Sequence, residues 1–559
     1  MKKLLKFNTT FISILFLIFL SLTFADERAD RVDKLFNQWD KVDTPGCALA
    51  VIKDGKIIYK RGYGMANLEH NIPISPKTVF YIGSVSKQFV AFSTAILAKQ
   101  GKLSLDDDIR KYVPELPDYG TPVTIRHLLH HTSGLRDYLA LLDIAGIDFG
   151  YFHEKDVLEL ITRQKELNFK SGEEYLYSNS GYFLLAVIVE RASGKSLRKF
   201  AEENIFRPLG MKNSHFHDDY TEIIKDRASG YYPAGKGKYK NFISTFDCVG
   251  SGGLFTSVED LFLWDQNFYH HKVGGKDLIN FILTRGTLNN GKKLNYAFAF
   301  RIESYKGLKT VGHGGALGGY RSAFIRFPEQ NFSVICLSNL SSFNPTKLCQ
   351  QVADIYLADQ FKEERARTGV KPTEKAKFIK LPKKKLKEKV VSYIDRRTGA
   401  IRSLFLKDGK LILEAFGQKF PLGAISETEF QILEAQFQAF IKFEKQSKRK
   451  PMLLHIHPEG EKLETYEAFK SAKPTPEQLK EYEGDYYSEE IEVTFKLVLK
   501  EGKLFFVHKN APKPPLQPTL QDTFAVRGFK IRFFRDEEKG ISGFILNAGR
   551  VKNLRFNKK

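Results

Sequence analysis

The pattern of apolar and polar positions divides the chain into two regions, and the first combines strand-like and helical segments. Two apolar runs flank Asp54-Gly55, a dipeptide typical of a tight hairpin turn. Strands at both ends of a helical middle predict an α+β domain whose sheet is completed when the chain returns. The helical spacing occurs at 89–97, 125–129 and 181–189, and the strand-like runs return at 323–327 and 332–337.

From about Lys375 the pattern changes to short alternating runs broken by Gly, Asp and Pro, with no convincing helix, and this pattern repeats. We predict two tandem β-modules, each with about eight short strands, enough to close a small barrel. One larger sheet domain with chance internal similarity is the alternative. The matching positions are Leu386, Tyr393, Lys407–Leu411, Phe430 and Ile441–Phe443 in the first copy, and Leu479, Tyr486, Lys500–Leu504, Phe524 and Ile531–Phe533 in the second.

The start of the chain has the composition of a targeting segment. Basic residues precede an apolar run, Phe11–Phe24, which is followed by Ala25 and acidic residues. This run is shorter than the roughly 20 residues that span a membrane. We therefore predict a signal peptide over 1–25, cleaved after Ala25, and an exported protein in the periplasm or outside the cell. An uncleaved anchor is the alternative.

The formal net charge of +22 at pH 7 is informative only when the positions of the basic residues are considered. The densest lysines lie between Lys371 and Lys389, where we expect a solvated linker or attraction to an anionic envelope surface. A nucleic-acid partner is not expected, because an exported chain seldom meets one. The predicted layout is an α+β domain over 26–361, a basic linker over 362–380, and β-modules over 381–470 and 471–559.

The cysteines do not indicate a zinc site. The sequence has four of them and no C-x-x-C motif. Export permits disulfides, yet Cys47 and Cys336 lie inside apolar, strand-like runs, where buried free thiols are expected. We expect no metal and no cofactor.

Ser84 and Lys87 form an S-x-x-K motif at the start of the first helical segment. Positions three apart share one face of a helix, so the hydroxyl and the amine can meet. Free backbone N–H groups and the helix dipole at a helix start also favour a developing anion. A lysine with a lowered pKa can then take the hydroxyl proton. Two common residues at this spacing are weak evidence alone.

Two further elements supply the groups that a serine nucleophile needs. Tyr177 and Asn179 precede the helical segment after Gly181; a phenol near an ammonium can act as a base, and an amide can orient a lysine and a carbonyl. His313-Gly314-Gly315 leads into Ala316 on what resembles an edge strand, where small residues let a substrate backbone approach. Each element alone is better explained as a packing or turn feature.

Together, in this order and at these separations, the three elements resemble the superfamily of class C β-lactamases, D-alanyl-D-alanine carboxypeptidases, D-aminopeptidases and related esterases. The resemblance covers about 25–361. It implies a β-lactamase-like/transpeptidase fold, an antiparallel sheet with flanking helices plus an all-helical region. At the matching motifs it implies Ser84 as acylated nucleophile, Lys87 and Tyr177 as the proton-transfer pair, Asn179, His313, Gly314 and Gly315 as substrate-binding residues, and the Ser84 and Ala316 N–H groups as the oxyanion hole.

One departure from the β-lactamase pattern bears on the substrate. His313 stands where β-lactamases have the lysine of K-T-G, which resembles the D-aminopeptidase, carboxypeptidase and esterase branches. We expect this imidazole to become charged near pH 5.5 and then to attract a substrate carboxylate.

The resembling D-amino-acid peptidases carry C-terminal lipocalin-like barrels, as predicted here. The implied function is hydrolysis of D-amino-acid peptides, small esters or amides, or β-lactams, through an acyl-enzyme. The alternative is a penicillin-binding or envelope-binding protein with little hydrolytic activity. The sequence leaves the oligomeric state open.

Overall fold

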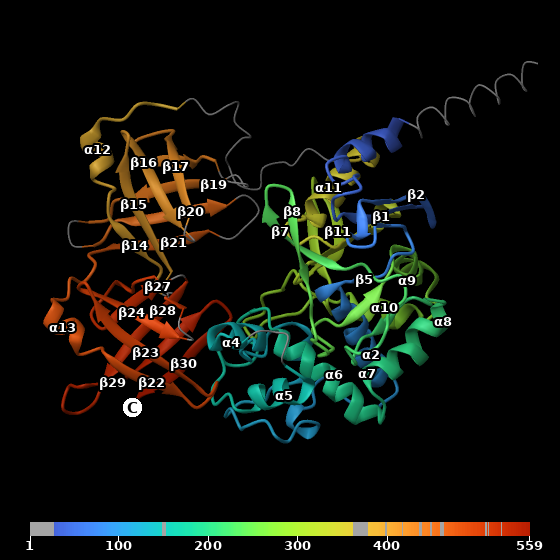
Figure 1. Cartoon of the computed structure of the whole chain (residues 1–559), viewed down its shortest axis with the longest axis horizontal. Coiled ribbons are helices and arrows are strands. Elements are labelled where there is room, and N and C mark those ends of the chain that lie inside the picture. The colour runs from blue at the N-terminus through green and yellow to red at the C-terminus, as the bar shows by residue number, and fades with distance from the viewer. Residues whose placement is uncertain are drawn as a thin grey trace, which may run out of the picture. The chain divides into compact units, whose positions relative to one another are not determined.

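A computed structural model describes residues 27–147, 152–361, 378–396, 400–415, 418–434, 439–447, 450–458, 463–508, 511–512, 514–526 and 528–559 (Figure 1). The predicted signal peptide and residues 362–377 of the predicted linker lie outside these ranges. The chain separates into two compact units: one runs to Leu139 and from Ile147 to Arg365, and the other comprises Ala140–Gly146 and Ala366–Lys559. Within the described ranges, no helix combines the length and apolar character that crossing a membrane requires.

The first unit is built on a six-stranded antiparallel sheet that joins the two ends of this part of the chain. Asp54 and Gly55 both have positive φ angles, 48° and 76°, as the predicted hairpin turn requires. The central strand β1 (Cys47–Lys53) is buried up to Ile52, and it pairs with β2 (Lys56–Tyr63) on one side and with the returning β13 (Phe332–Ser338) on the other. The strand order is β10 (Arg301–Tyr305), β11 (Leu308–Leu317), β12 (Tyr320–Phe327), β13 (Phe332–Ser338), β1 (Cys47–Lys53) and β2 (Lys56–Tyr63).

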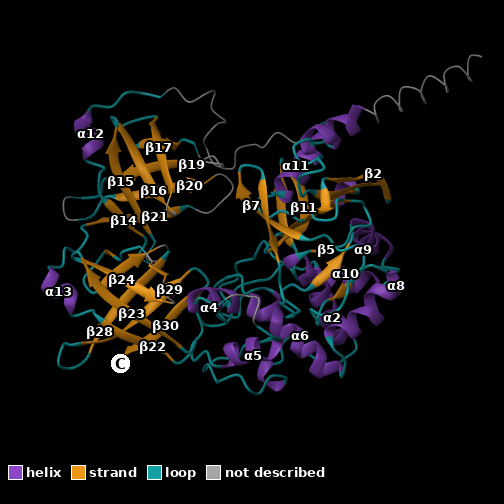
Figure 2. Cartoon of the chain, viewed as in Figure 1, coloured by secondary structure: helices purple, strands orange, loops and turns teal. Residues whose placement is uncertain are grey.

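The helical middle of the chain contains the predicted helices (Figure 2). The three predicted segments appear as α2 (Lys87–Lys99), α3 (Ile125–Leu129) and α6 (Asn179–Ser193). α11 (Pro345–Tyr356) packs on β12 and β13. The remaining helices here are α4 (Tyr138–Ala145), α5 (Glu154–Thr162), α7 (Leu197–Ala201), α8 (Arg207–Leu209), α9 (Val258–His270) and α10 (Gly275–Ile282).

Small sheets connect the helices to the main sheet. The one that matters for the site has the order β5 (Phe80–Tyr81), β9 (Leu254–Thr256) and β6 (His215–Phe216). The others pair β3 (Met65–Asn67) with β4 (Ile72–Pro73), and β7 (Gly230–Gly235) with β8 (Lys238–Phe242). All four cysteines are buried and free, which confirms the expectation for Cys47 and Cys336.

The first C-terminal module is a closed eight-stranded barrel, as the repeat predicts. Its apolar side chains face inward and include Tyr393, Phe430 and Ile441, each of which is almost fully buried. The strands are β14 (Ser392–Ile394), β15 (Ile401–Lys407), β16 (Lys410–Ala415), β17 (Gln418–Ala424), β18 (Glu429–Ile432), β19 (Ala439–Glu444), β20 (Leu453–Pro458) and β21 (Glu464–Phe469).

The second module repeats this arrangement with nine strands. Its two end strands, β25 (Ala511–Pro512) and β26 (Gln517–Pro518), do not pair with each other within the described residues. Tyr486, Phe524 and Ile531 are buried like their counterparts in the first module. The order is β25 (Ala511–Pro512), β24 (Lys503–His508), β23 (Val493–Lys500), β22 (Gly484–Ser488), β30 (Val551–Lys558), β29 (Ile541–Ala548), β28 (Phe529–Arg535), β27 (Thr523–Val526) and β26 (Gln517–Pro518).

The prediction that this region has no convincing helix is wrong. Each module begins with one short helix, α12 (Lys383–Lys387) and α13 (Pro476–Lys480). The repeated leucines, Leu386 and Leu479, lie in these helices and are buried. A helix of five residues is too short to show a helical period, so the pattern alone could not reveal it.

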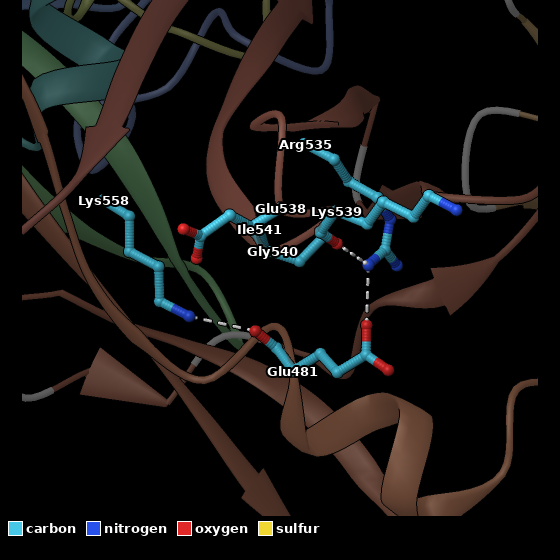
Figure 3. A pocket seen from close by; sticks show the side chains of 7 residues that line it. All are labelled: Glu481, Arg535, Glu538, Lys539, Gly540, Ile541 and Lys558. Atoms are coloured by element: carbon cyan, nitrogen blue, oxygen red, sulfur yellow. Dashed lines mark hydrogen bonds and ion pairs between the residues drawn. The ribbon is translucent and has the colours of Figure 1, made fainter.

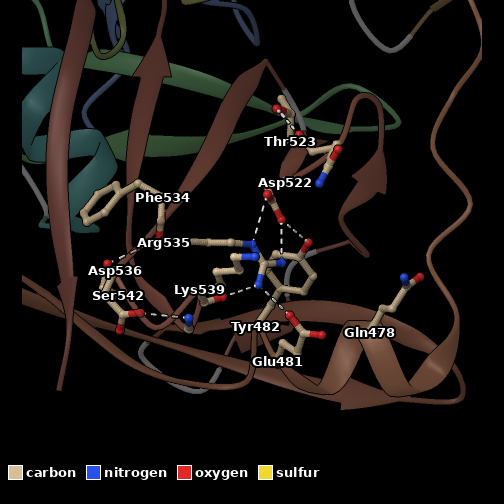
Figure 4. A network of polar contacts seen from close by, with 12 residues as sticks. Gln478, Glu481, Tyr482, Asp522, Thr523, Phe534, Arg535, Asp536, Lys539 and Ser542 are labelled. Atoms are coloured by element: carbon tan, nitrogen blue, oxygen red, sulfur yellow. Dashed lines mark hydrogen bonds and ion pairs between the residues drawn. The ribbon is translucent and has the colours of Figure 1, made fainter.

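A surface pocket of the second module is lined mainly by charged residues (Figure 3). Arg535 Nη1 donates to the Glu481 carboxylate at 2.8 Å, and Lys558 Nζ donates to the Glu481 carbonyl at 2.9 Å. Arg535 Nη2 and the Tyr482 hydroxyl both donate to Asp522 Oδ1, at 2.9 and 2.6 Å (Figure 4). These contacts join the segment after α13 to the ends of β28 and β30.

Candidate active site

Ser84 lies in a 3-10 turn, Gly83–Ser86, that leads directly into α2. The turn is held from two sides: Ser322 Oγ donates to the Ile82 carbonyl at 2.6 Å, and Ile82 N donates to the Leu254 carbonyl at 3.1 Å. Gly83 has a φ angle of 53°, and a Cβ there would lie 2.5 Å from Ala316 N. Only glycine therefore fits this position, where the nucleophile turn touches β11.

Lys87 is the first residue of α2 and is fully buried. Its Nζ lies 3.1 Å from Ser84 Oγ and donates to Asn179 Oδ1 at 2.9 Å and to the carbonyl of Ser251. The Nζ also lies 5.0 Å from the centroid of the Tyr177 ring, close enough for a cation–π contact. The predicted Ser84–Lys87 contact is present. The Lys87 amine also donates to the Ser251 carbonyl, which the motif did not indicate.

Asn179 is held by a carboxylate that sequence reasoning missed. Asp137 Oδ2 accepts from Asn179 N at 2.7 Å and from Asn179 Nδ2 at 2.8 Å, and both side chains are buried. Since Nδ2 donates to Asp137, the amide oxygen must point the other way, toward Lys87. The Asp137 carboxylate therefore lies at the N-terminus of α6, where a negative charge is favourable. No motif marks it, because it lies 42 residues from Asn179.

His313 belongs to a chain of hydrogen bonds whose direction can be assigned. Ser178 N donates to His131 Nδ1 at 3.2 Å, which leaves His131 Nε2 as the N–H that donates to the Tyr296 hydroxyl at 3.1 Å. The Tyr296 hydroxyl then donates to His313 Nε2 at 3.1 Å, and His313 Nδ1 donates to the Gly314 carbonyl at 2.6 Å. In each histidine, one ring nitrogen donates a hydrogen bond and the other accepts one, which is the pattern of a neutral imidazole.

The expectation that His313 becomes charged near pH 5.5 is wrong. Burial lowers the pKa of His313 from 6.5 to about 3; its bond to the Gly314 carbonyl opposes this shift, and the charges of Lys87 and Arg301 add to it. Desolvation penalises the imidazolium more than one hydrogen bond can offset. The ring therefore accepts from Tyr296 throughout the physiological range, and it cannot supply a positive charge to a substrate carboxylate.

The glycines after His313 differ in the space around them. β10 pairs with β11 only as far as Gly312, so in the described structure residues 313–317 are not paired on that side. A Cβ on Gly315 would lie 2.0 Å from the Ile82 carbonyl oxygen and 2.9 Å from Ser84 N, whereas the nearest atoms to a Cβ on Gly314 are 3.5 Å away. The predicted edge segment thus lies directly against the nucleophile turn, and only Gly315 is required by contact.

The structure brings the predicted residues together, each by a different kind of contact. Ser84, Lys87 and Asn179 are joined by hydrogen bonds, and Gly315 and Ala316 abut Gly83 and Ser84. The Tyr177 ring lies against Lys87 and has its centroid 6.1 Å from that of His313. The residues that sequence reasoning did not place here are Asp137, His131, Tyr296 and Ser251.

Comparison with known proteins agrees with this geometry. A sequence model described as Beta-lactamase matches residues 32–352. A D-aminopeptidase of Gluconobacter oxydans (strain 621H) is 30% identical over 296 residues, 53% of this chain and 56% of that protein. A penicillin-binding protein of Bacillus subtilis (strain 168) is 32% identical over 309 residues, 53% of this chain and 68% of that protein. The chain thus spans a little over half the length of the D-aminopeptidase it matches.

A solved structure with the same fold covers a larger share of this chain. The octameric penicillin-binding protein homologue from Pyrococcus abyssi superposes with a TM-score of 0.55 and 24% identity, over 78% of this chain and 99% of that chain. The family match covers the sheet, the helical middle and every residue of the Ser84 site. On this match and this geometry, the chain belongs to the Beta-lactamase family.

Proposed function

We propose that this chain is an exported serine hydrolase that cleaves amide bonds through an acyl-Ser84 intermediate. The observation that carries the proposal is the coordination of Lys87 Nζ by Ser84 Oγ, Asn179 Oδ1 and the Ser251 carbonyl. A buried amine that touches a half-buried serine hydroxyl is the arrangement that activates a nucleophile.

The partners of Lys87 explain how it would move a proton. Asn179 Oδ1 and the Ser251 carbonyl can only accept, so they occupy two N–H groups of the amine. The third position of the nitrogen faces Ser84 Oγ, either as a lone pair that takes the hydroxyl proton or as an N–H that stabilises the oxygen. The same geometry thus serves both protonation states. Tyr177, whose ring lies against Lys87, is the second group proposed for proton transfer.

The backbone around the nucleophile supplies the proposed oxyanion hole. Ser84 N and Ala316 N lie on the two segments that Gly83 and Gly315 allow to touch. Donors fixed in this way need no reorganisation when charge develops on the substrate oxygen. We propose that the free side of 313–317 pairs with the substrate backbone, as an added strand would.

We propose a D-amino-acid amide or peptide as the substrate. The D-aminopeptidase relatives support this, and so does His313, because a neutral imidazole offers no charge to the carboxylate that β-lactams carry. A penicillin-binding protein without turnover is the second candidate, favoured by the Bacillus relative.

A labelled fluorophosphonate and a labelled penicillin test the nucleophile, and paired D- and L-alanine p-nitroanilides test the substrate. We expect the wild type to be tagged once and to turn over the D-anilide, and Ser84→Ala to do neither. Ser93→Ala is the matched control, because Ser93 Oγ bonds within α2 to the Phe89 carbonyl. Stable tagging by penicillin without anilide turnover would favour the penicillin-binding alternative, and tagging of Ser84→Ala would reject Ser84.

Export has its own test. Mass spectrometry of the protein from its native host gives the mature N-terminus, which we expect at Asp26. An intact Met1 on the purified protein would reject cleavage after Ala25.

A further inference from the structure

A second group of polar side chains lies on β6 and in the turn that follows it, with His217 buried and His215 and Glu222 half-buried. β6 pairs with β9 through His215 and Phe216, and His217 N extends this pairing by donating to the Gly253 carbonyl at 2.8 Å. Alternation along an extended chain places residues 215 and 217 on the same face. The following turn returns Glu222 to this face.

The three side chains converge. One ring nitrogen of each histidine and one carboxylate oxygen of Glu222 all lie within 4.8 Å of one another. The imidazole rings meet edge to face, with their centroids 5.6 Å apart. Within the described structure this is the one group of three or more His, Cys, Asp or Glu residues that is placed to share a metal ion.

Two nitrogens of this group lack a partner. His215 Nε2 and His217 Nδ1 are both shielded from solvent and have no hydrogen-bond partner among the described residues. His217 as a whole is only 5% exposed. Buried polar atoms in folded proteins nearly always bond to something, so two unsatisfied imidazole nitrogens in one cluster indicate a missing partner.

The charge states suit a cation. Burial, reinforced by the charge of Arg198, lowers the pKa of His215 to about 4, and burial also lowers the pKa of His217, with Arg227 adding to it. Both rings are therefore neutral at pH 7, the form that binds metals. Arg198 holds the pKa of Glu222 below its usual value, so this carboxylate is ionised.

Arg198 also fixes the carboxylate. Its Nη1 and Nη2 donate to Glu222 at 2.6 and 2.8 Å, and Nη1 also donates to Asp218 at 3.0 Å. Carboxylates that bind metal ions are themselves commonly held by hydrogen bonds from a neighbouring group, as Arg198 holds Glu222 here. Arg198 shares its charge between Asp218 and Glu222, and each Glu222 oxygen that it bonds still has a lone pair that can bind an ion.

We propose that His215, His217 and Glu222 bind one divalent transition-metal ion of the zinc class. Two imidazoles and one carboxylate are a donor set that Zn²⁺ accepts, with water as the fourth ligand. In the bound state each of the three ligand atoms would lie about 2.0–2.2 Å from the ion.

This site would clamp a strand rather than perform the chemistry. The Gly253 carbonyl accepts from His217 N, and Gly253 N donates to the Tyr81 hydroxyl at 3.0 Å. Gly253 lies two residues after Ser251, whose carbonyl holds Lys87. The ion would hold β6 against β9 and so stabilise the segment whose Ser251 carbonyl contacts Lys87. It would not contact the reacting groups of the Ser84 site.

Zn²⁺ and Co²⁺ are the probes for the test, added to the full chain after chelator treatment. We expect one Zn²⁺ per chain by elemental analysis and titration calorimetry, absorption bands of a four-coordinate site with Co²⁺, and a rise in Tm on adding Zn²⁺. His215→Gln and His217→Gln should each weaken binding at least tenfold, and Glu222→Gln should weaken it less.

The chain contains its own control. His455 and His457 have the same His-x-His spacing, and His455 Nε2 lies 3.1 Å from Glu444, but they form no three-ligand group with the residues that the structure describes. His457→Gln should leave Zn²⁺ binding unchanged. Failure of the wild type to retain one equivalent of Zn²⁺, or equal retention by folded His217→Gln protein, would overturn the proposal. The wild-type stoichiometry decides the matter even if a variant fails to fold.

Discussion

The Lys87 centre and the cluster of His215, His217 and Glu222 are both polar and both contact residues 251–256, yet their polar atoms are satisfied differently. Lys87 Nζ contacts three oxygens, and Asn179 and His313 are each held from behind by another side chain. In the cluster, His215 Nε2 and His217 Nδ1 have no hydrogen-bond partner among the described residues. The first site is preorganised without a ligand, whereas the second is complete only with one.

The largest effect should follow from removing the amine. Lys87→Ala should lower turnover by at least about a thousandfold, because Ser84 loses the group that manages its proton. Progress curves with the D-anilide measure this loss. His217→Gln should keep most of the turnover and lose the metal, so each variant abolishes the property that the other retains. Equal losses of turnover in both variants would mean that the two sites are one functional unit.

A second effect separates two neighbouring glycines of the first site. Gly315→Ala places a Cβ 2.0 Å from the Ile82 carbonyl oxygen and must displace the nucleophile turn, whereas Gly314→Ala meets nothing closer than 3.5 Å. A displacement of about 1 Å costs on the order of a hundredfold in rate. We expect that loss for Gly315→Ala and a severalfold change for Gly314→Ala, both in kcat/KM. Similar values for the two variants would show that contact with the turn does not position Ser84.

The sequence predicted the parts of this molecule that depend on local pattern. The hairpin at Asp54-Gly55, the buried thiols of Cys47 and Cys336, and the Ser84–Lys87 contact each depend on neighbouring residues or on one face of one element. The tandem modules were predictable because the same apolar positions recur, as the burial of both Tyr393 and Tyr486 shows.

The rest depends on contacts between distant segments. Asp137 reaches Asn179, and His131 reaches Tyr296 across 165 residues, so no spacing rule could join them. The neutral state of His313 follows from burial, which the motif does not reveal. The convergence of Glu222 with His215 and His217 depends on a turn, so the His-x-His pattern alone did not indicate a site.

A third effect tests the hydrogen-bond chain behind His313. Tyr296→Phe leaves His313 Nε2 and His131 Nε2 buried without the hydroxyl, and should lower the free energy of unfolding by about 1–3 kcal/mol. Urea unfolding at pH 7 measures this change. Tyr305→Phe, which loses a bond to Asp354 at the edge of the sheet, is the control and should cost less. If the two variants lose the same stability, the Tyr296 hydroxyl does not provide the hydrogen bond to His313 Nε2 that is described above.

The last effect is a pH dependence of stability, and its sign follows from the lowered pKa of His313. The pKa of His313 is about 3 in the folded chain and 6.5 when exposed, so between these values the unfolded state binds one more proton. The contribution of His313 to the free energy of unfolding is therefore fully present above pH 6.5. It falls as the pH is lowered, by up to about 1.4 kcal/mol per pH unit.

Unfolding in urea between pH 7 and pH 4.5 should show this slope, and folded His313→Gln protein should lose that part of it. His153 gives the opposite control, because its bond to Asp247 raises its pKa. That group contributes stability below its unfolded pKa and loses it as the pH rises, so His153→Gln should change the slope in the other direction. An unchanged slope in His313→Gln would mean that folding does not lower the pKa of His313, so that the ring becomes protonated in the folded chain as the pH falls through its ordinary value. An imidazolium would then be available at the Ser84 site, and recognition of a substrate carboxylate by His313 would return.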